Sequence, residues 1–141
     1  MKQETLNPTE IPDLDFKLFK DTFSICRLNK DSPIPEWLEN SDFFSLTRTP
    51  DELSIVCNQV LVKSDDKIII NKDWRIIKIK GPLDFTLTGI IAYISDLLKK
   101  NNIPIFVIST YDTDYILTKN QYINKVLIVL KSNGHKIVIE K

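Results

Sequence analysis

The chain has 141 residues, of which 43% are hydrophobic and 27% are charged, and its 19 basic residues balance its 19 acidic ones. A chain of this length can build one good core or two very small ones, and its balanced charge argues against nucleic acid or an anionic membrane as a partner. No apolar run approaches the roughly 20 residues that cross a bilayer, and the polar N-terminus does not resemble a signal peptide, so we expect a cytoplasmic protein with no membrane partner.

The first half of the chain is expected to hold short strands after a disordered tail over residues 1–13. Pro8 and Pro12 interrupt that tail, and nothing apolar repeats in it. Alternating apolar residues and turn signals then predict the following elements. They are extended stretches around residues 16–18 and 23–25, a helical turn over 36–40, strands over 43–47 and 53–57, a charged loop over 63–67 and a short apolar segment over 68–70.

The second half has a stronger pattern. A strand is expected over 74–80, and the spacing of apolar residues from Leu87 to Leu98 predicts an amphipathic helix that Thr86 or Thr88 caps and Asn101-Asn102 ends. Further strands over 103–109 and 115–118, a helix over 120–133 ending at Gly134, and a strand over 135–140 complete the pattern.

This second half follows the order βαββαβ, which is typical of the ferredoxin-like fold, an antiparallel sheet with two helices on one face. The first half is expected to be an abbreviated unit of the same plan, so the fold class is α+β with units over residues 14–73 and 74–141. The continuous apolar run from Ile103 to Ile108 indicates that the other sheet face is covered too, by the first half, a second copy of the chain or both.

Three segments in this order resemble the small bacterial ACT-domain proteins: Phe43–Cys57, Gly81–Ile90 and Ile108–Leu117. The ACT module of that family is related to that of the CASTOR-type arginine sensors, and the resemblance extends over about residues 16–139. It implies two ACT-like units side by side and an amino-acid site at an ACT–ACT interface. The sensors select arginine with additional domains that a chain of this length lacks, so arginine is not the expected ligand.

The resemblance places the ligand at the loop between the first strand and first helix of the second unit. A free amino acid needs donors for its carboxylate and acceptors for its ammonium. The backbone N–H groups that open the helix supply the first, and Asp84, Asp112 or Asp114 could supply the second. The candidate ligand-binding residues are Asp84, Phe85, Thr86, Leu87, Thr88, Gly89 and Ile90 in the loop, and Ser109, Thr110, Tyr111, Asp112, Thr113 and Asp114 in the following turn.

Simpler structural roles compete with these assignments. Gly89 could only allow the helix to pack closely on the sheet, and Asp112 and Asp114 could only form their turn. Thr47, Arg48 and Thr49 are candidate contacts from the first half, although Arg48 could equally form a surface ion pair.

Residues for catalysis or metal binding are few. The only histidine, His135, follows Gly134 in a turn and is expected to be exposed. Cys26 and Cys57 stand alone in apolar segments and are expected to be buried free thiols. No nucleotide-binding, zinc or nucleophile motif occurs, so we expect no cofactor, no metal site and no enzyme activity.

We therefore expect a regulatory or sensor module that binds a small molecule and forms a homo-oligomer. The alternatives are a structural dimerisation module without a ligand and, as a third reading, a small enzyme.

Overall fold

The computed structural model describes residues 11–80 and 89–141, and these form two compact units. Unit 2 is residues 21–75, and unit 1 combines residues 11–20 with the described residues from 76 onwards. The sequence division at residues 73 and 74 differs from this one, because strand β1 (Asp15–Leu18) pairs with strands of the second half. The expected tail lies mostly outside the described residues, but Ile11 is buried in the core of unit 1.

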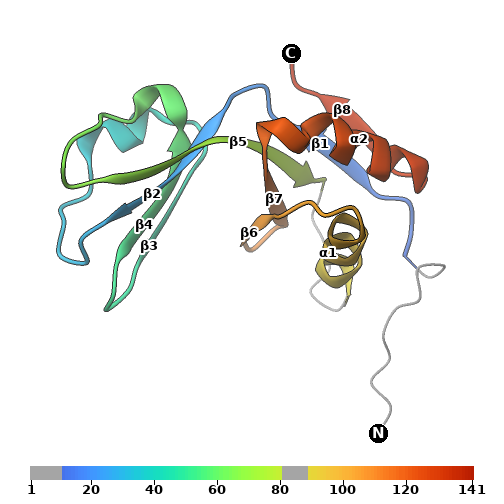
Figure 1. Ribbon diagram of the computed structural model, residues 1–141, viewed down its shortest axis with the longest axis horizontal. Helices are drawn as coiled ribbons and strands as arrows, with labels where there is room; N and C mark the ends of the chain where they lie inside the picture. Colours follow the sequence, from blue (N-terminus) through green and yellow to red (C-terminus); the bar gives the residue numbers. More distant parts are fainter. Residues whose placement is uncertain (1–10, 81–88) are drawn as a thin grey trace, which may run out of the picture. The chain divides into compact units, whose positions relative to one another are not determined.

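The strands of unit 1 follow the order β6-β7-β5-β1-β8 (Figure 1). Along the chain the βαββαβ order predicted from sequence is confirmed. The order is made by the end of β5 (Ile69–Ile79), α1 (Ile90–Lys100), β6 (Phe106–Ser109), β7 (Asp114–Lys119), α2 (Ile123–Ser132) and β8 (Lys136–Ile139). The first strand of the chain lies between β5 and β8, antiparallel to one and parallel to the other. This sheet therefore combines antiparallel and parallel pairs, whereas the sequence pattern predicted a wholly antiparallel sheet.

Both helices of unit 1 end in the same type of turn. At α2, Gly134 has φ +89° and donates to Lys131, while His135 donates to Leu130, as in a Schellman motif. At α1, Asn102 takes the left-handed position with φ +58°. Both predicted helix ends are thus confirmed, and each turn directs the chain back toward the sheet.

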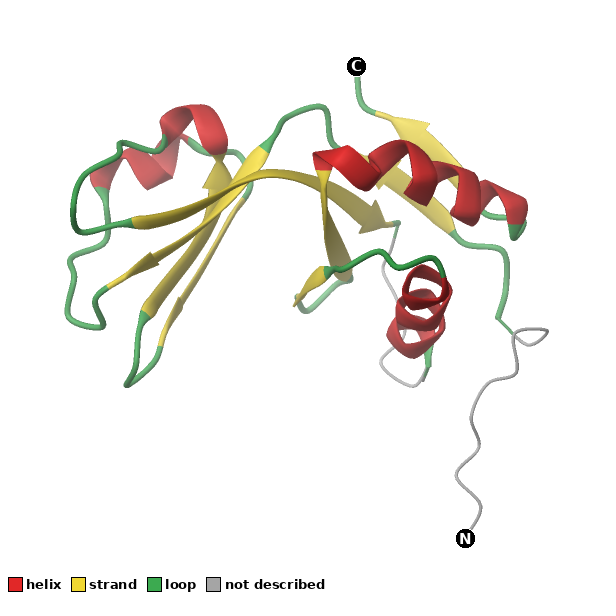
Figure 2. Ribbon diagram, in the orientation of Figure 1, coloured by secondary structure: helices red, strands yellow, loops and turns green. Residues whose placement is uncertain are grey.

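The core of unit 1 lies where the two helices cover one face of the sheet (Figure 2). Phe16 and Leu18 of β1 alternate inwards, as do Ile77 and Ile79 of β5. The helices contribute residues at helical spacing, Ile90, Ile94 and Leu98 from α1 and Ile123, Val126 and Leu130 from α2. This packing explains why β1 belongs to unit 1: its two inward side chains are among the least exposed in the chain.

Unit 2 repeats the plan with single turns in place of helices. Its order along the chain is β2 (Phe23–Leu28), η1 (Glu36–Asn40), β3 (Phe44–Arg48), β4 (Leu53–Asn58), η2 (Gln59–Leu61) and the start of β5. The strands lie in the order β3-β4-β2-β5, which is the ferredoxin-like order, so the abbreviated unit predicted from sequence is present. Its small core includes the free thiols Cys26 and Cys57, both buried as predicted.

Strand β5 is longer than the sequence pattern indicated, because two predicted segments, 68–70 and 74–80, form one strand. The polar residues between them include Asp73, whose φ of +70° makes a bulge opposite β2. Gln59 stabilises this conformation, since its side chain accepts from the Asp73 N–H at 2.7 Å and donates to the Asp73 carboxylate at 3.0 Å. Local polarity therefore marked a bulge rather than a break.

The strand predicted over 103–109 is also different, since β6 begins only at Phe106. A second copy of the chain as the cover of the other sheet face stays a prediction, and in the single chain Phe106, Val107 and Ile108 are half-buried. The reason is the position of β6 at the end of the strand order, where β7 is its only strand neighbour within the described chain.

Candidate functional site

The first part of the predicted ligand site lies outside the described residues. This applies to Asp84, Phe85, Thr86, Leu87 and Thr88, and so to both predicted helix caps. The structure therefore describes the two ends of the predicted loop, Lys80 and Gly89.

Gly89 opens helix α1 in a conformation that glycine adopts readily. Its φ is +87°, in the left-handed region, and its carbonyl accepts the first helical hydrogen bond, from the N–H of Tyr93 at 2.8 Å. The side chain of Ile90, the next residue, is buried in the core of unit 1. Ile90 can therefore offer a ligand only its backbone, and the turn favours glycine at position 89 whether or not a ligand binds.

The turn between β6 and β7 is tied to the end of β5. Thr113, which is 3% exposed, donates from its Oγ1 to the carbonyl of Ile79 at 2.6 Å. Its own carbonyl accepts from the N–H and the Oγ1 of Thr110, each at 2.9 Å, which closes the turn. The structure thus brings the predicted residues Ser109 to Asp114 beside the strand end from which the predicted loop departs.

Within this turn the polar side chains differ in exposure. Tyr111 and Asp112 are exposed, whereas Asp114 is half-buried and faces Ser109 in the β6–β7 pairing. Burial, with a smaller contribution from the charge of Asp112, raises the pKa of Tyr115 above its ordinary value. Asp112 therefore contributes negative charge at this end of unit 1, as an ammonium site requires.

The candidate residues from the first half belong to unit 2 and have structural roles there. The guanidinium of Arg48 donates to the carbonyls of Lys30 and Ser32, and Thr49 Oγ1 accepts from the N–H groups of Asp51 and Glu52. Thr47 is exposed. Arg48 holds a loop through carbonyl groups, so neither an ion pair nor a ligand is needed to explain its presence.

His135 is buried, and the expectation that it would be exposed is wrong. It is 5% exposed, and its Nδ1 accepts from the backbone N–H of Leu14 at 3.0 Å. Its Nε2 lies 2.7 Å from the hydroxyl of Tyr93, and its ring forms T-shaped pairs with the rings of Phe16 and Tyr93. Burial lowers the pKa of His135 below 6.5, and the nearby carboxylate of Asp13 opposes this shift. The left-handed turn at Gly134 points the histidine back to β1, which the local sequence does not reveal.

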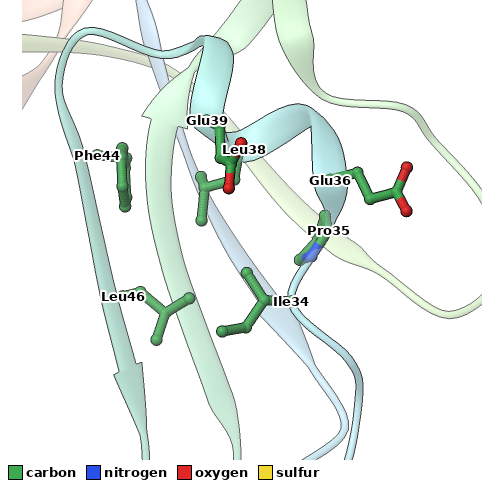
Figure 3. Close-up of a pocket in the computed structure, with 7 residues that line it drawn as sticks. All are labelled: Ile34, Pro35, Glu36, Leu38, Glu39, Phe44 and Leu46. Atoms are coloured by element: carbon green, nitrogen blue, oxygen red, sulfur yellow. The ribbon is translucent and has the colours of Figure 1, made fainter.

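Unit 2 has an apolar groove that was not predicted from sequence. It has a volume of about 440 Å³ and lies between η1 and β3 (Figure 3). We call it the η1–β3 groove, and it is lined by Ile34, Pro35, Glu36, Leu38, Glu39, Phe44 and Leu46. The available signal was the alternation of Phe44 and Leu46 on a strand that follows a helical segment of only one turn.

Metal-binding clusters and membrane-spanning helices are absent from residues 11–80 and 89–141. This part of the chain contains no group of three or more metal-binding side chains. None of its helices is long and apolar enough to cross a membrane.

The chain is similar to known protein families and to solved structures. The family model for the ACT domain matches residues 69–132, and a model for an N-terminal domain matches residues 21–65. The crystal structure of protein Atu0741 from Agobacterium tumefaciens is 34% identical in sequence, with a TM-score of 0.85, and the match covers 93% of this chain and 96% of that one.

More distant structures share the fold. The allosteric aspartate kinase of Clostridium acetobutylicum matches 81% of this chain with 33% of its own length, at 15% identity and a TM-score of 0.61. The regulatory subunit of aspartate kinase from Thermus thermophilus matches 81% of this chain with 93% of its own, at 12% identity and a TM-score of 0.53.

Proposed function

The chain belongs to a family of ACT-domain proteins together with the Agobacterium protein, and on that premise we propose that it is a regulatory module that binds a small amino acid. The hydrogen bond from Thr113 to Ile79 is the observation that supports this most directly. It holds an acidic turn next to the end of β5, after which the predicted ligand-binding loop follows in the sequence.

The chemistry of the two ends of that loop is complementary to a zwitterion. The first turn of α1 has backbone N–H groups that the helix itself does not satisfy, and these favour the carboxylate of a ligand. Asp112 in the neighbouring turn, and Asp84 in the loop, are the proposed partners of the ammonium. Loop residues Phe85 to Thr88 would complete the site.

An interface between ACT units of two chains is part of the proposal. Large apolar side chains are exposed on unit 1, among them Ile128, Val138 and Ile139, which are 64%, 52% and 53% exposed. The half-buried strand β6 also lies at the end of the strand order. Such surfaces favour association, so we propose a homo-oligomer that acts in the cytoplasm without catalytic machinery.

The same surfaces favour a second candidate function, a structural dimerisation module that binds no ligand. The relation to CASTOR-type sensors remains part of the first proposal. Arginine is not the proposed ligand, because the resemblance implies that those sensors select it with domains other than the ACT module.

A thermal-shift screen of the standard amino acids separates the two candidates. A ligand at about 100 times its Kd would add about 2.7 kcal/mol of stability and so raise the melting temperature. A response to one or a few amino acids supports the regulatory module, whereas an unchanged melting temperature across the panel supports the structural one.

A further inference from the structure

The η1–β3 groove exists because a single turn stands where the fold plan has a helix. Helix α1 has 11 residues, whereas η1 has five and so extends only about 10 Å at 2.0 Å per residue. Strand β3 also has five residues but extends about 17 Å. The turn therefore covers only part of the strand, and Phe44 and Leu46 flank an opening.

Specific bonds prevent η1 from continuing as a longer helix. Pro35 precedes it, and Ser41 follows in an extended conformation. The Ser41 hydroxyl donates to the carbonyl of Phe43 and accepts from the N–H of Asn58. The chain is thereby fixed as it turns into β3, so the groove is a built feature of unit 2.

The lining of the groove is apolar and partly open to solvent. Leu38 is 2% exposed, whereas Ile34 and Phe44 are 54% and 47% exposed. A volume of about 440 Å³ lies within the range of about 300–1,000 Å³ that small-molecule pockets occupy. The groove can therefore accept a side chain or ring of moderate size.

The charge of the lining has one sign. Glu36 and Glu39 are its only charged members among the described residues, and both are exposed. Figure 3 shows Glu39 beside Leu38 on the groove side of η1, whereas Glu36 extends away from the other lining residues. The carboxylate of Glu39 and the ring of Phe44, which both line the groove, favour a cation, by direct attraction and by interaction with the ring.

We propose that the η1–β3 groove binds a small organic amine, with its ammonium beside Glu39 and an aromatic or branched apolar group between Ile34, Phe44 and Leu46. An amino acid would bring a carboxylate close to the same acidic residues and would bind less well. This site is therefore distinct from the proposed amino-acid site of unit 1 and does not depend on it.

Amide chemical shifts of the full-length protein test the proposal with three related probes. We expect 2-phenylethylammonium to cause saturable shifts in residues 34–46. Phenylalanine and 3-phenylpropionate, which carry the same ring with a carboxylate, should bind at least about fivefold more weakly. Glu39→Gln should weaken amine binding by about three- to fivefold, in the range of exposed ion pairs.

Two variants of β3 form a matched pair. Phe44→Lys puts an ammonium into the groove and should abolish amine binding. Thr47→Lys adds the same charge to the same strand, on the opposite face, and should leave binding unchanged. Both positions are exposed, so both variants should fold.

The proposal is overturned if none of the probes shifts residues 34–46, or if amine and carboxylate bind equally and Glu39→Gln changes neither. It is also overturned if the wild type is an oligomer that Phe44→Lys, but not Thr47→Lys, dissociates. In that case a second copy of the chain, added at the edge strand β3, occupies the groove.

Discussion

His135 connects three segments of unit 1 through its two ring nitrogens. The N–H of Leu14 can only donate, so Nδ1 must be the unprotonated acceptor, and Nε2 carries the proton toward the hydroxyl of Tyr93. Protonation of Nδ1 would replace the bond to Leu14 with a contact between two donors. The hydrogen bonds of the folded protein thus favour the neutral form of the His135 ring.

The first prediction follows from the lowered pKa of His135. Both states carry a neutral ring well above pH 6.5, so this group then adds no pH dependence. As the pH falls below about 6.5 the unfolded chain takes up the proton first, and stability is lost until the lower pKa of the folded state is passed. Because the chain has one histidine, its ring signals can be titrated directly by NMR. A folded-state pKa at or above 6.5 would contradict the assignment. Urea unfolding of His135→Gln is an independent check, because its free energy of unfolding should depend less on pH below 6.5 than that of the wild type.

The second prediction concerns the two left-handed helix ends. At Gly134 a Cβ would lie 3.0 Å from Oδ1 of Asp13, in addition to the strain of φ +89°. We expect Gly134→Ala to lower the free energy of unfolding by about 1–3 kcal/mol. Asn102→Gly should be neutral or stabilising, because glycine tolerates this left-handed conformation better than asparagine does. Urea denaturation measures both, and equal effects of Gly134→Ala and Asn102→Gly would argue against the backbone explanation.

Because Gly89 has a positive φ, a bulky substitution there cannot separate an effect on ligand binding from an effect on stability. Gly89→Val should destabilise the protein whatever its effect on a ligand, because valine is strained at φ +87°. Variants of the β6–β7 turn are therefore better tests of ligand binding.

At the scale of elements, the β6–β7 turn depends on Thr113. Thr113→Val removes the donor to Ile79 and leaves a buried carbonyl without this partner, at a cost of about 1–3 kcal/mol. Amide exchange of residues 109–114 should become faster than exchange in α2. Thr113→Ser is the control, since it keeps the hydroxyl and should retain most of the protection. Unchanged exchange in Thr113→Val would show that the bond does not hold the turn.

The sequence predicted elements well where periodicity is strong and poorly where distant contacts decide. Apolar spacing, together with Asn101-Asn102 after α1 and Gly134 after α2, was sufficient to place the C-terminal ends of both helices. The burial of His135 depends on Leu14, which lies 121 residues away in sequence. The bulge at Asp73 depends on Gln59, so local polarity did not reveal it, whereas the η1–β3 groove depends on the shortness of η1, which the local pattern did predict. Of the predicted site, Asp84 to Thr88 lie outside the described residues, whereas Thr47–Thr49 and the part from Gly89 onwards can be compared with the structure.

At the scale of the whole molecule, unit 1 is discontinuous in sequence. Residues 11–20 and the residues from 76 onwards share one core, and unit 2 is inserted between them. Strand β8 pairs with β1 through the register of Phe16 with Ile137. The second half of the chain is thus incomplete without the first strand.

A further prediction tests this arrangement with fragments. Residues 74–141 alone lack β1, so Ile79 and Ile77 lose their strand partners Phe16 and Leu18, and we expect no cooperative unfolding transition. Residues 1–20 joined by a flexible linker to residues 76–141 should recover one. Circular dichroism during thermal unfolding measures both fragments. A cooperative transition in the shorter fragment, equal to that of the linked one, would show that β1 is dispensable.

The most direct test of the account is amide chemical-shift mapping of the full-length protein with the standard amino acids, using an Asp112→Asn variant and the control Asp66→Asn. Asp66 is exposed in a loop of unit 2 and lies outside both proposed sites. We predict that one or a few amino acids shift Gly89, Ile90 and residues 109–114, that Asp112→Asn weakens this binding, and that Asp66→Asn does not. The absence of any shift in these residues across the panel, with the protein folded, would contradict the proposed regulatory function.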